Sequence, residues 1–153
     1  MKAAYSIRKA IPSDLDALIR FTLQEALEAE GAEKNVEGVR RGVLAAFADP
    51  PAATYWMVET REGQVVGSTS SITEWSDYNG GYYWWVQSIF IVPEHRGRGV
   101  VDLLLDHLAR TAKAAGALDL RLAVHHSNRR ALRAYQRCGF AVAPYVIMRK
   151  PLS

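Results

Sequence analysis

A short loop of two glycines and two arginines, Arg96-Gly97-Arg98-Gly99, has the composition of an anion-binding site. The apolar residues 88–92, typical of a strand, precede it, and a helical pattern with Leu104, Leu105 and Leu108 on one stripe follows it. A glycine-rich turn between a strand and a helix leaves backbone N–H groups unpaired at the positive end of the helix dipole. Glycine lets the backbone approach an anion closely, and arginine adds positive charge around it. The loop therefore predicts a site for the phosphates of a cofactor.

Other phosphate-binding patterns do not fit this loop. The dinucleotide-binding pattern G-x-G-x-x-G fails at Asp102, and the G-x-x-x-x-G-K-[ST] pattern of ATP-binding loops occurs nowhere in the chain. The alternative that stays open is an ordinary strand-to-helix turn whose arginines are solvated.

A second informative pattern covers residues 128–140. Asn128 is a good N-cap for a helix, and Gly139 followed by the apolar Phe140 is typical of its C-terminal end. Tyr135 lies on the apolar face of the helix between them. Each of these residues also has a purely structural explanation, so this pattern alone does not indicate a function.

Together, in this order and spacing, the two patterns resemble the GNAT superfamily of N-acetyltransferases over essentially the whole chain. The cofactor motif of the family, Q/R-x-x-G-x-G/A, matches at Arg96 and Gly99 and departs at Val101, where the family has a small residue. An opening pattern Arg-x-Ala-x-x-Ser-Asp matches over residues 8–14. The downstream signature Asn-x-x-Ala-x-x-x-Tyr-x-x-x-Gly-Phe matches at Asn128, Ala131, Tyr135, Gly139 and Phe140.

The resemblance implies an acyltransferase that moves an acetyl group from the cosubstrate acetyl-CoA to a primary amine. The pyrophosphate would lie on the amides of the glycine loop, the pantetheine arm would pair with the preceding strand, and Asn128 would hold the arm from the opposite side. The implied cofactor-binding residues are Phe90, Ile91, Val92, Arg96, Gly97, Arg98, Gly99, Val100, Val101 and Asn128. Tyr135 is expected to act as the general acid for the leaving thiolate. A core aromatic is the alternative role for this tyrosine.

The acceptor side of the reaction is less clearly marked. No residue is an obvious covalent relay, so we expect the amine to attack the thioester directly in a ternary complex. A protonated amine needs a base, and the candidates are Glu74 or a water held by Glu25, Gln87 and strand carbonyls. Alternation along the aromatic strand brings Tyr83, Trp85 and Gln87 to one face. The candidate substrate-binding residues are therefore Glu25, Tyr83, Trp85 and Gln87, with core packing of the aromatics and a solvated acidic face left open.

Charge is distributed unevenly along the chain, although the net charge is only +3. Residues 94–137 hold nine Lys and Arg against four Asp and Glu, whereas residues 25–37 hold five Glu against one Lys. The basic half suits an anionic cofactor and the acidic segment suits a cationic amine. Since the arginines cluster around one phosphate site, we expect a small-molecule amine acceptor and no nucleic acid.

Several other classes are disfavoured. The single cysteine, Cys138, excludes an internal disulfide and favours a reducing, cytoplasmic location. No apolar run reaches membrane-spanning length, so no membrane association is expected. His125 and His126 are expected to point to opposite faces of a strand end, so no metal is expected. A non-catalytic CoA-binding or sensory module, a protein N-terminal or lysine acetyltransferase, a longer acyl donor and a homodimer stay open.

These residues need elements to position them. We expect one domain over residues 1–153, a size that buries a sizeable core. Hydrophobic periodicity predicts strands over residues 5–9, 54–61, 64–75, 82–92, 118–124 and 141–148, and helices over 13–26, 36–47, 101–115 and 129–138. The composition is mixed α/β. The resemblance implies a mostly antiparallel central sheet, splayed between two central strands, with helices on both faces.

Overall fold

Five strands form one sheet in a computed structural model that describes residues 4–153. Their order in space is their order in the chain, namely β1 (Tyr5–Lys9), β2 (Thr54–Thr60), β3 (Val65–Ser76), β4 (Gly81–Ile91) and β5 (Leu120–Leu122). The first four pair antiparallel with their neighbours, and β5 pairs parallel with β4. The mixed, mostly antiparallel sheet predicted from the sequence is confirmed.

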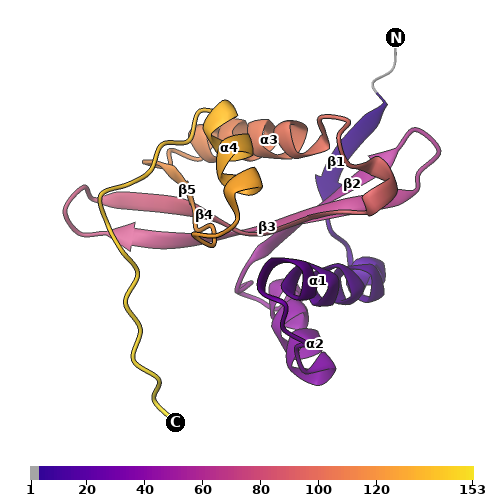
Figure 1. Ribbon diagram of the computed structural model, residues 1–153, viewed down its shortest axis with the longest axis horizontal. Coiled ribbons are helices and arrows are strands. Elements are labelled where there is room, and N and C mark those ends of the chain that lie inside the picture. The colour runs from indigo at the N-terminus through magenta and orange to yellow at the C-terminus, as the bar shows by residue number, and fades with distance from the viewer. Residues whose placement is uncertain (1–3) are drawn as a thin grey trace.

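Helices cover both faces of this sheet, as expected. Helices α1 (Leu15–Glu30) and α2 (Val36–Leu44) lie below the sheet in Figure 1, and α3 (Val100–Ala114) and α4 (Arg129–Arg137) lie above it. Single turns of 3₁₀ helix, η1 (Pro12–Asp14), η2 (Ala45–Phe47) and η3 (Pro93–His95), join these elements.

The alternating side chains of β2 show how the two layers are packed. Met57 points toward α1 and is buried with Leu18 and Phe21. Its neighbour Trp56 points to the opposite face, where Leu108 of α3 is buried beside it. The period of two along a strand and the apolar stripe of each helix therefore build one core on each face of the sheet.

The sheet opens between β4 and β5. Their pairing covers only Trp84–Val86 of β4 against β5, and β4 then runs on to Ile91 without β5 beside it. A β-bulge accompanies this opening: Ser70 pairs with Ser88 and Ser71 pairs with Val86, so Gln87 is an extra residue of β4. This is the splay between two central strands that the sequence resemblance predicted.

Two sequence predictions are wrong near the C-terminus. Residues 118–124 form only the short β5, and residues 141–148 form no strand and are exposed. A strand needs a partner for its backbone groups, and in this chain the segment leaves the sheet, so no ladder forms. His125 and His126 also do not diverge, because the chain is irregular there and their rings stack with centroids 4.5 Å apart. Over residues 4–153, no helix has the length and apolarity needed to cross a membrane.

Candidate active site

The glycine loop opens α3 in a conformation that non-glycine residues rarely adopt. Gly97 has φ of 72° and Gly99, the N-cap of α3, has φ of 78°, both in the left-handed region. An added Cβ at either glycine would meet nothing within 4 Å, so backbone conformation and not space requires glycine here. The first N–H groups of α3 are thereby directed out of the helix end, where they have no intrahelical partner.

A cavity of about 670 Å³ adjoins this loop and is bounded by α1, the free edge of β4 and α4. Most of the sequence-predicted residues meet here. Those that line it are Glu25, Phe90, Ile91, Arg96, Gly97, Gly99, Val100, Val101, Asn128 and Tyr135. Val101 also packs against the core beside α3, which accounts for a β-branched residue at the position where the family motif has a small one.

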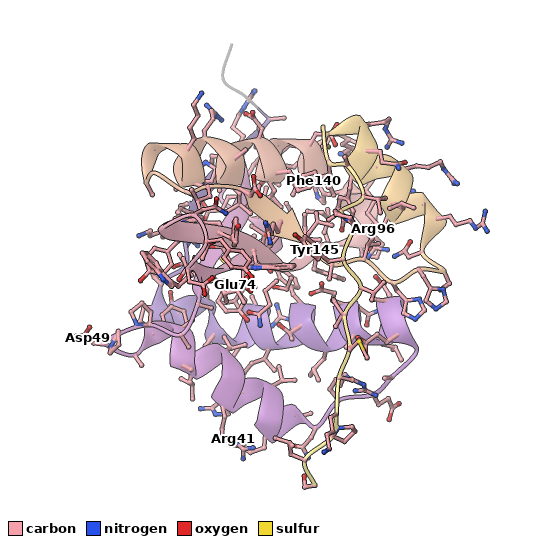
Figure 2. All side chains as sticks on the ribbon, turned by 90° about the vertical axis from the view of Figure 1, so that its left-hand side faces the viewer. Arg41, Asp49, Glu74, Arg96, Phe140 and Tyr145 are labelled. Atoms are coloured by element: carbon pink, nitrogen blue, oxygen red, sulfur yellow. The ribbon has the colours of Figure 1, made fainter. Side chains whose placement is uncertain are left out.

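Six predicted residues lie outside the cavity lining: Val92, Arg98, Glu74, Tyr83, Trp85 and Gln87. The N–H of Val92 donates to the carbonyl of Val66, so this main-chain group faces β3 and not the open edge of β4. Arg98 lines a separate hollow beside Tyr5. The remaining four belong to the β3–β4 hairpin before or at the bulge, and Figure 2 shows Glu74 separated from Arg96 on this face of the molecule.

Glu25 projects from α1 onto the open edge of β4. Its Oε1 accepts the backbone N–H of Ile89 at 3.1 Å. Burial raises the pKa of Glu25 from 4.5 to about 7, the Ile89 N–H opposes that shift, and the nearby charges of Glu28 and Glu30 add to it. A carboxyl group with this pKa exchanges its proton near neutrality, as a general base must.

Arg96 contacts the same open edge of β4 at Ile91, two residues after Ile89. Its Nε donates to the carbonyl of Ile91 at 2.8 Å, and its terminal nitrogen forms an ion pair with Glu28 at 2.8 Å. Its guanidinium group also lies 5.4 Å from the centre of the Phe90 ring. Side chains of the protein thus hold two main-chain groups of β4 that, in a regular sheet, would bond to the next strand.

Tyr135 faces the cavity from α4. Its ring packs against Phe140 with centroids 6.2 Å apart, and within residues 4–153 its hydroxyl makes no hydrogen bond. Burial raises the pKa of Tyr135, and the charge of Glu25 raises it further. The hydroxyl therefore keeps its proton at neutral pH and is available as a donor to a bound ligand.

The structure adds arginines of α4 that the sequence analysis did not single out. Arg130, Arg133 and Arg137 all line the cavity. Their spacing of three and four residues places them on one helical stripe, a signal that was present in the sequence. They give the cavity a cationic wall opposite α1, on whose side Arg96 is paired with Glu28.

A polar cluster in the centre of the sheet was also missed. Ser70 of β3 is fully buried, its hydroxyl bonds to that of Ser88 in β4, and the Tyr55 hydroxyl bonds to Ser70 and to Thr22 of α1. Burial raises the pKa of Tyr55, with a further contribution from the charge of Glu25. The run of polar residues over 68–71 inside an otherwise apolar strand pattern was the available signal.

Comparison with known proteins places this geometry in a family. The model of the acetyltransferase (GNAT) family matches residues 18–140. This chain is 41% identical to the streptothricin acetyltransferase of Streptomyces lavendulae over 56 residues. The matched segment is 37% of this chain and 30% of that enzyme. Over 99 residues, 65% of its length, this chain is 26% identical to the L-amino acid N-acyltransferase MnaT of Escherichia coli (strain K12), of which this covers 58%.

The chain thus matches less than two thirds of the length of either curated relative. A crystal structure of a possible acetyltransferase from Clostridium difficile 630 superposes with a TM-score of 0.91 at 25% identity, covering 99% of both chains. The family match includes both the glycine loop at the start of α3 and the helix that carries Tyr135. This chain belongs to the acetyltransferase (GNAT) family.

Proposed function

We propose that this protein transfers an acetyl group from acetyl-CoA to the primary amine of a small, cationic molecule. The observation that carries the proposal is the pairing of Glu25 and Tyr135 across one cavity, which the glycine loop opens into. One group exchanges a proton near neutrality and the other retains its proton. Amine acylation needs both kinds of group, since the amine must lose a proton and the leaving thiolate must gain one.

The residues of the cavity fit acetyl-CoA, which would supply the activated acetyl thioester. The left-handed loop and the N-terminus of α3 suit a pyrophosphate, and the arginine stripe of α4 suits further phosphate charge. The open edge of β4 offers the N–H of Ile89 and the carbonyl of Ile91 to an amide-bearing arm. Both groups are now held by side chains, Glu25 and Arg96, which would be exchanged for the ligand.

In this proposal Glu25 takes one proton from the incoming ammonium group, and the neutral nitrogen attacks the thioester carbonyl. As the C–S bond breaks, Tyr135 donates its proton to the departing sulfur, and the second proton that nitrogen loses on forming the amide restores the Tyr135 hydroxyl. Cys138 does not line the cavity; its thiol donates to Asp102 at 3.2 Å, and burial raises its pKa. A thiol of this kind is a poor nucleophile, so we infer direct attack by the amine and no covalent acetyl-enzyme.

The acceptor class is inferred from charge. Glu25 and Glu28 of α1 line the side of the cavity opposite the arginines of α4. An acidic wall attracts an ammonium group and disfavours a carboxylate. The names of the two curated relatives, a streptothricin acetyltransferase and an L-amino acid N-acyltransferase, are compatible with a small amine acceptor.

The proposal is tested by following CoA release from acetyl-CoA with a panel of cationic, neutral and acidic amines. We expect amine-dependent turnover, fastest with cationic acceptors, and a loss of kcat of about a hundredfold or more in Glu25→Gln. Asp16→Asn is the matched control: Asp16 lies on the same helix, is exposed, and does not line the cavity.

Two results would contradict the proposal. Tight binding of acetyl-CoA without turnover on any amine would support a non-catalytic CoA-binding module instead. Turnover that survives unchanged in Glu25→Gln would leave this carboxylate with a structural role only.

A further inference from the structure

One peptide group of β4, the group between Ser88 and Ile89 and hereafter the 88–89 peptide, is held by side chains at both of its polar atoms. Its carbonyl oxygen accepts a hydrogen bond from the hydroxyl of Thr69 in β3 at 2.7 Å. Its N–H donates to the carboxyl group of Glu25 at 3.1 Å. A hydroxyl, a peptide group and the carboxyl group that we assign as the base therefore form one continuous chain of hydrogen bonds.

Thr69 lies in a part of the sheet where an apolar residue would fit the pattern. It is fully buried, and its direct partners on the neighbouring strands are Trp56 of β2 and Ile89 of β4. Both partners pack into the apolar core beneath α3, where a valine would suit a strand. A buried hydroxyl needs a hydrogen-bond partner, and that of Thr69 finds it in the carbonyl of Ser88. The hydroxyl is thus what distinguishes Thr69 from an ordinary core residue.

The 88–89 peptide lies directly after the bulge in β4. Gln87, the extra residue of the bulge, precedes Ser88. A bulge disrupts the ladder and increases the local twist, so regular pairing does not fix the direction of the next peptide group. Ser88 is held by side chains instead, because its hydroxyl bonds to that of Ser70 and its carbonyl accepts from Thr69.

Two physical effects connect the hydroxyl of Thr69 to Glu25. The bond to the carbonyl of Ser88 fixes the plane of the 88–89 peptide, and with it the direction of the Ile89 N–H at the open edge of β4. The same bond polarises the peptide, because hydrogen bonds in a chain strengthen one another, so the N–H becomes a stronger donor. A stronger donor favours the ionised form of the carboxyl group that accepts from it.

We propose that Thr69 is a positioning residue of the active site, which acts on Glu25 through the 88–89 peptide. Thr69 does not line the cavity. Its hydroxyl directs the N–H of Ile89 to the open edge of β4, and this N–H holds the carboxyl group of Glu25 there. The inference deepens the proposed function and rests on the role of Glu25 in it.

A substitution at Thr69 leaves the other groups around Glu25 in place. The charged and titratable side chains that influence Glu25 or share its cavity come from α1, β2, the glycine loop and α4, namely Glu28, Glu30, Tyr55, Arg96, Arg130, Arg133, Tyr135 and Arg137. Within residues 4–153, no hydrogen bond joins Thr69 to any of them. A change in the titration of Glu25 upon substitution of Thr69 is therefore transmitted by the 88–89 peptide.

Three substitutions isolate the hydroxyl. Thr69→Val removes it and keeps the branched shape, whereas Thr69→Ser keeps it and removes the methyl group. Thr69→Ala also lacks the hydroxyl and repeats the test with a smaller side chain. The matched control is Ser71→Ala, because Ser71 is buried on the same strand and its hydroxyl accepts from Nε1 of Trp56 at 3.5 Å, away from the 88–89 peptide. Thermal melts establish that each variant is folded.

The first readout is the titration of Glu25, followed by NMR of its carboxyl carbon in the unliganded protein. We expect its midpoint to lie about 0.5 pH unit higher in Thr69→Val than in the unmodified protein, because a weaker N–H donor favours the protonated carboxyl group. Thr69→Ala should show the same increase. Thr69→Ser and Ser71→Ala should keep the midpoint of the unmodified protein.

The second readout is the release of CoA in the presence of an amine. We expect kcat/KM to fall about fivefold in Thr69→Val at a pH above the midpoint, and its rising limb to move to higher pH together with the titration of Glu25. Thr69→Ser should restore most of the lost activity, and Ser71→Ala should retain it.

The two readouts separate a failure of this proposal from a failure of the proposed function. An unchanged midpoint of Glu25 in Thr69→Val and Thr69→Ala overturns the proposal, whatever the turnover. Equal changes in Thr69→Val and Ser71→Ala also overturn it, since they would show a general loosening of β3. If the unmodified protein acetylates no amine, the proposed function fails, and the midpoint of Glu25 alone then supports or overturns the link from Thr69.

Discussion

Glu25 is the residue at which burial, charge and a backbone hydrogen bond act on one proton. If its carboxylate is the base, only the ionised form is active, and its pKa of about 7 sets the working range. We expect kcat/KM, which reports the unliganded enzyme, to rise with pH up to about 7 and to level off above it. In Glu25→Gln the remaining activity should lose this rising limb. The check is the pH profile of kcat/KM, and an unchanged profile in the variant would assign the titration to another group.

The same shift has a consequence for stability whose sign is opposite to that of most carboxylates. The folded state raises the pKa of Glu25 from 4.5 to about 7, so it holds the proton more tightly than the unfolded chain does. This contribution to the free energy of unfolding is fully present below pH 4.5 and is lost as pH rises through 7. The Tm of Glu25→Gln relative to the unmodified protein should therefore increase between pH 5 and pH 8 in thermal melts.

A substitution at Tyr135 that removes one oxygen atom distinguishes a catalytic role of this residue from a packing role. Tyr135→Phe keeps the ring contact with Phe140 and removes the hydroxyl of this cavity-lining residue. We expect kcat to fall roughly ten- to a thousandfold with little change in the affinity for acetyl-CoA. Tyr78→Phe, at a 95% exposed tyrosine of the β3–β4 turn, is the control. Equal turnover in both variants would make Tyr135 a packing residue.

At the scale of elements, the junction between β4 and α3 is the predicted anchor for the cofactor. Acetyl-CoA at a hundredfold excess over its Kd should stabilise the native state by about 2.7 kcal/mol and raise Tm accordingly. Gly99→Glu forces a side chain and a negative charge into the left-handed N-cap, and the shift should vanish. Gly63→Glu, at φ of 83° in the β2–β3 turn, applies the same backbone strain away from the cavity and should keep it. Differential scanning fluorimetry measures both.

Elements whose periodicity is local could be predicted from the sequence. The stripe that includes Leu104, Leu105 and Leu108 gave α3 correctly, and the glycine loop was located because glycine is required at positive φ. The strand predicted over residues 141–148 is absent. The local sequence pattern indicates that residues 145–148 suit a strand, but it carries no information on which strand would pair with them. Burial of Glu25 likewise depends on Ile89, a contact between positions far apart in the chain.

The bulge at Gln87 explains why the side chains of the aromatic strand β4 do not alternate regularly between the two faces of the sheet. Val86, Ile89 and Ile91 all pack toward α3, although the step from 86 to 89 is an odd number of residues. A regular strand would send Val86 and Ile89 to opposite faces. No residue type in this run marks the insertion, so the faces assigned to Tyr83, Trp85 and Gln87 from sequence hold only before the bulge.

At the scale of the whole molecule, the two sides of the cavity carry opposite charge. The acidic wall from α1 should increase the local concentration of a cationic amine, an effect that salt screens over about 10 Å at 0.1 M. We expect KM for a cationic acceptor to rise several-fold between roughly 0.05 and 0.5 M NaCl, and KM for a neutral amine to stay nearly constant. Steady-state kinetics with a matched pair of amines measures the difference. A clear preference for acidic acceptors would show that this charge is only a solvated surface.

The bulge also sets which kinds of mutation this strand tolerates. The side chain of Gln87 is exposed, so Gln87→Ala should leave folding and turnover almost unchanged. Deletion of Gln87 shortens β4 by one residue and removes the bulge, whereas Gln87→Ala removes only a side chain. The ladder would become regular, and either the residues before the gap or those after it would have to exchange faces, moving Phe90 out of the α1 core or Val86 out of the α3 core. In a scan of single-residue deletions along β4, we therefore expect folding to be impaired most at the bulge, where substitution of the side chain impairs it least.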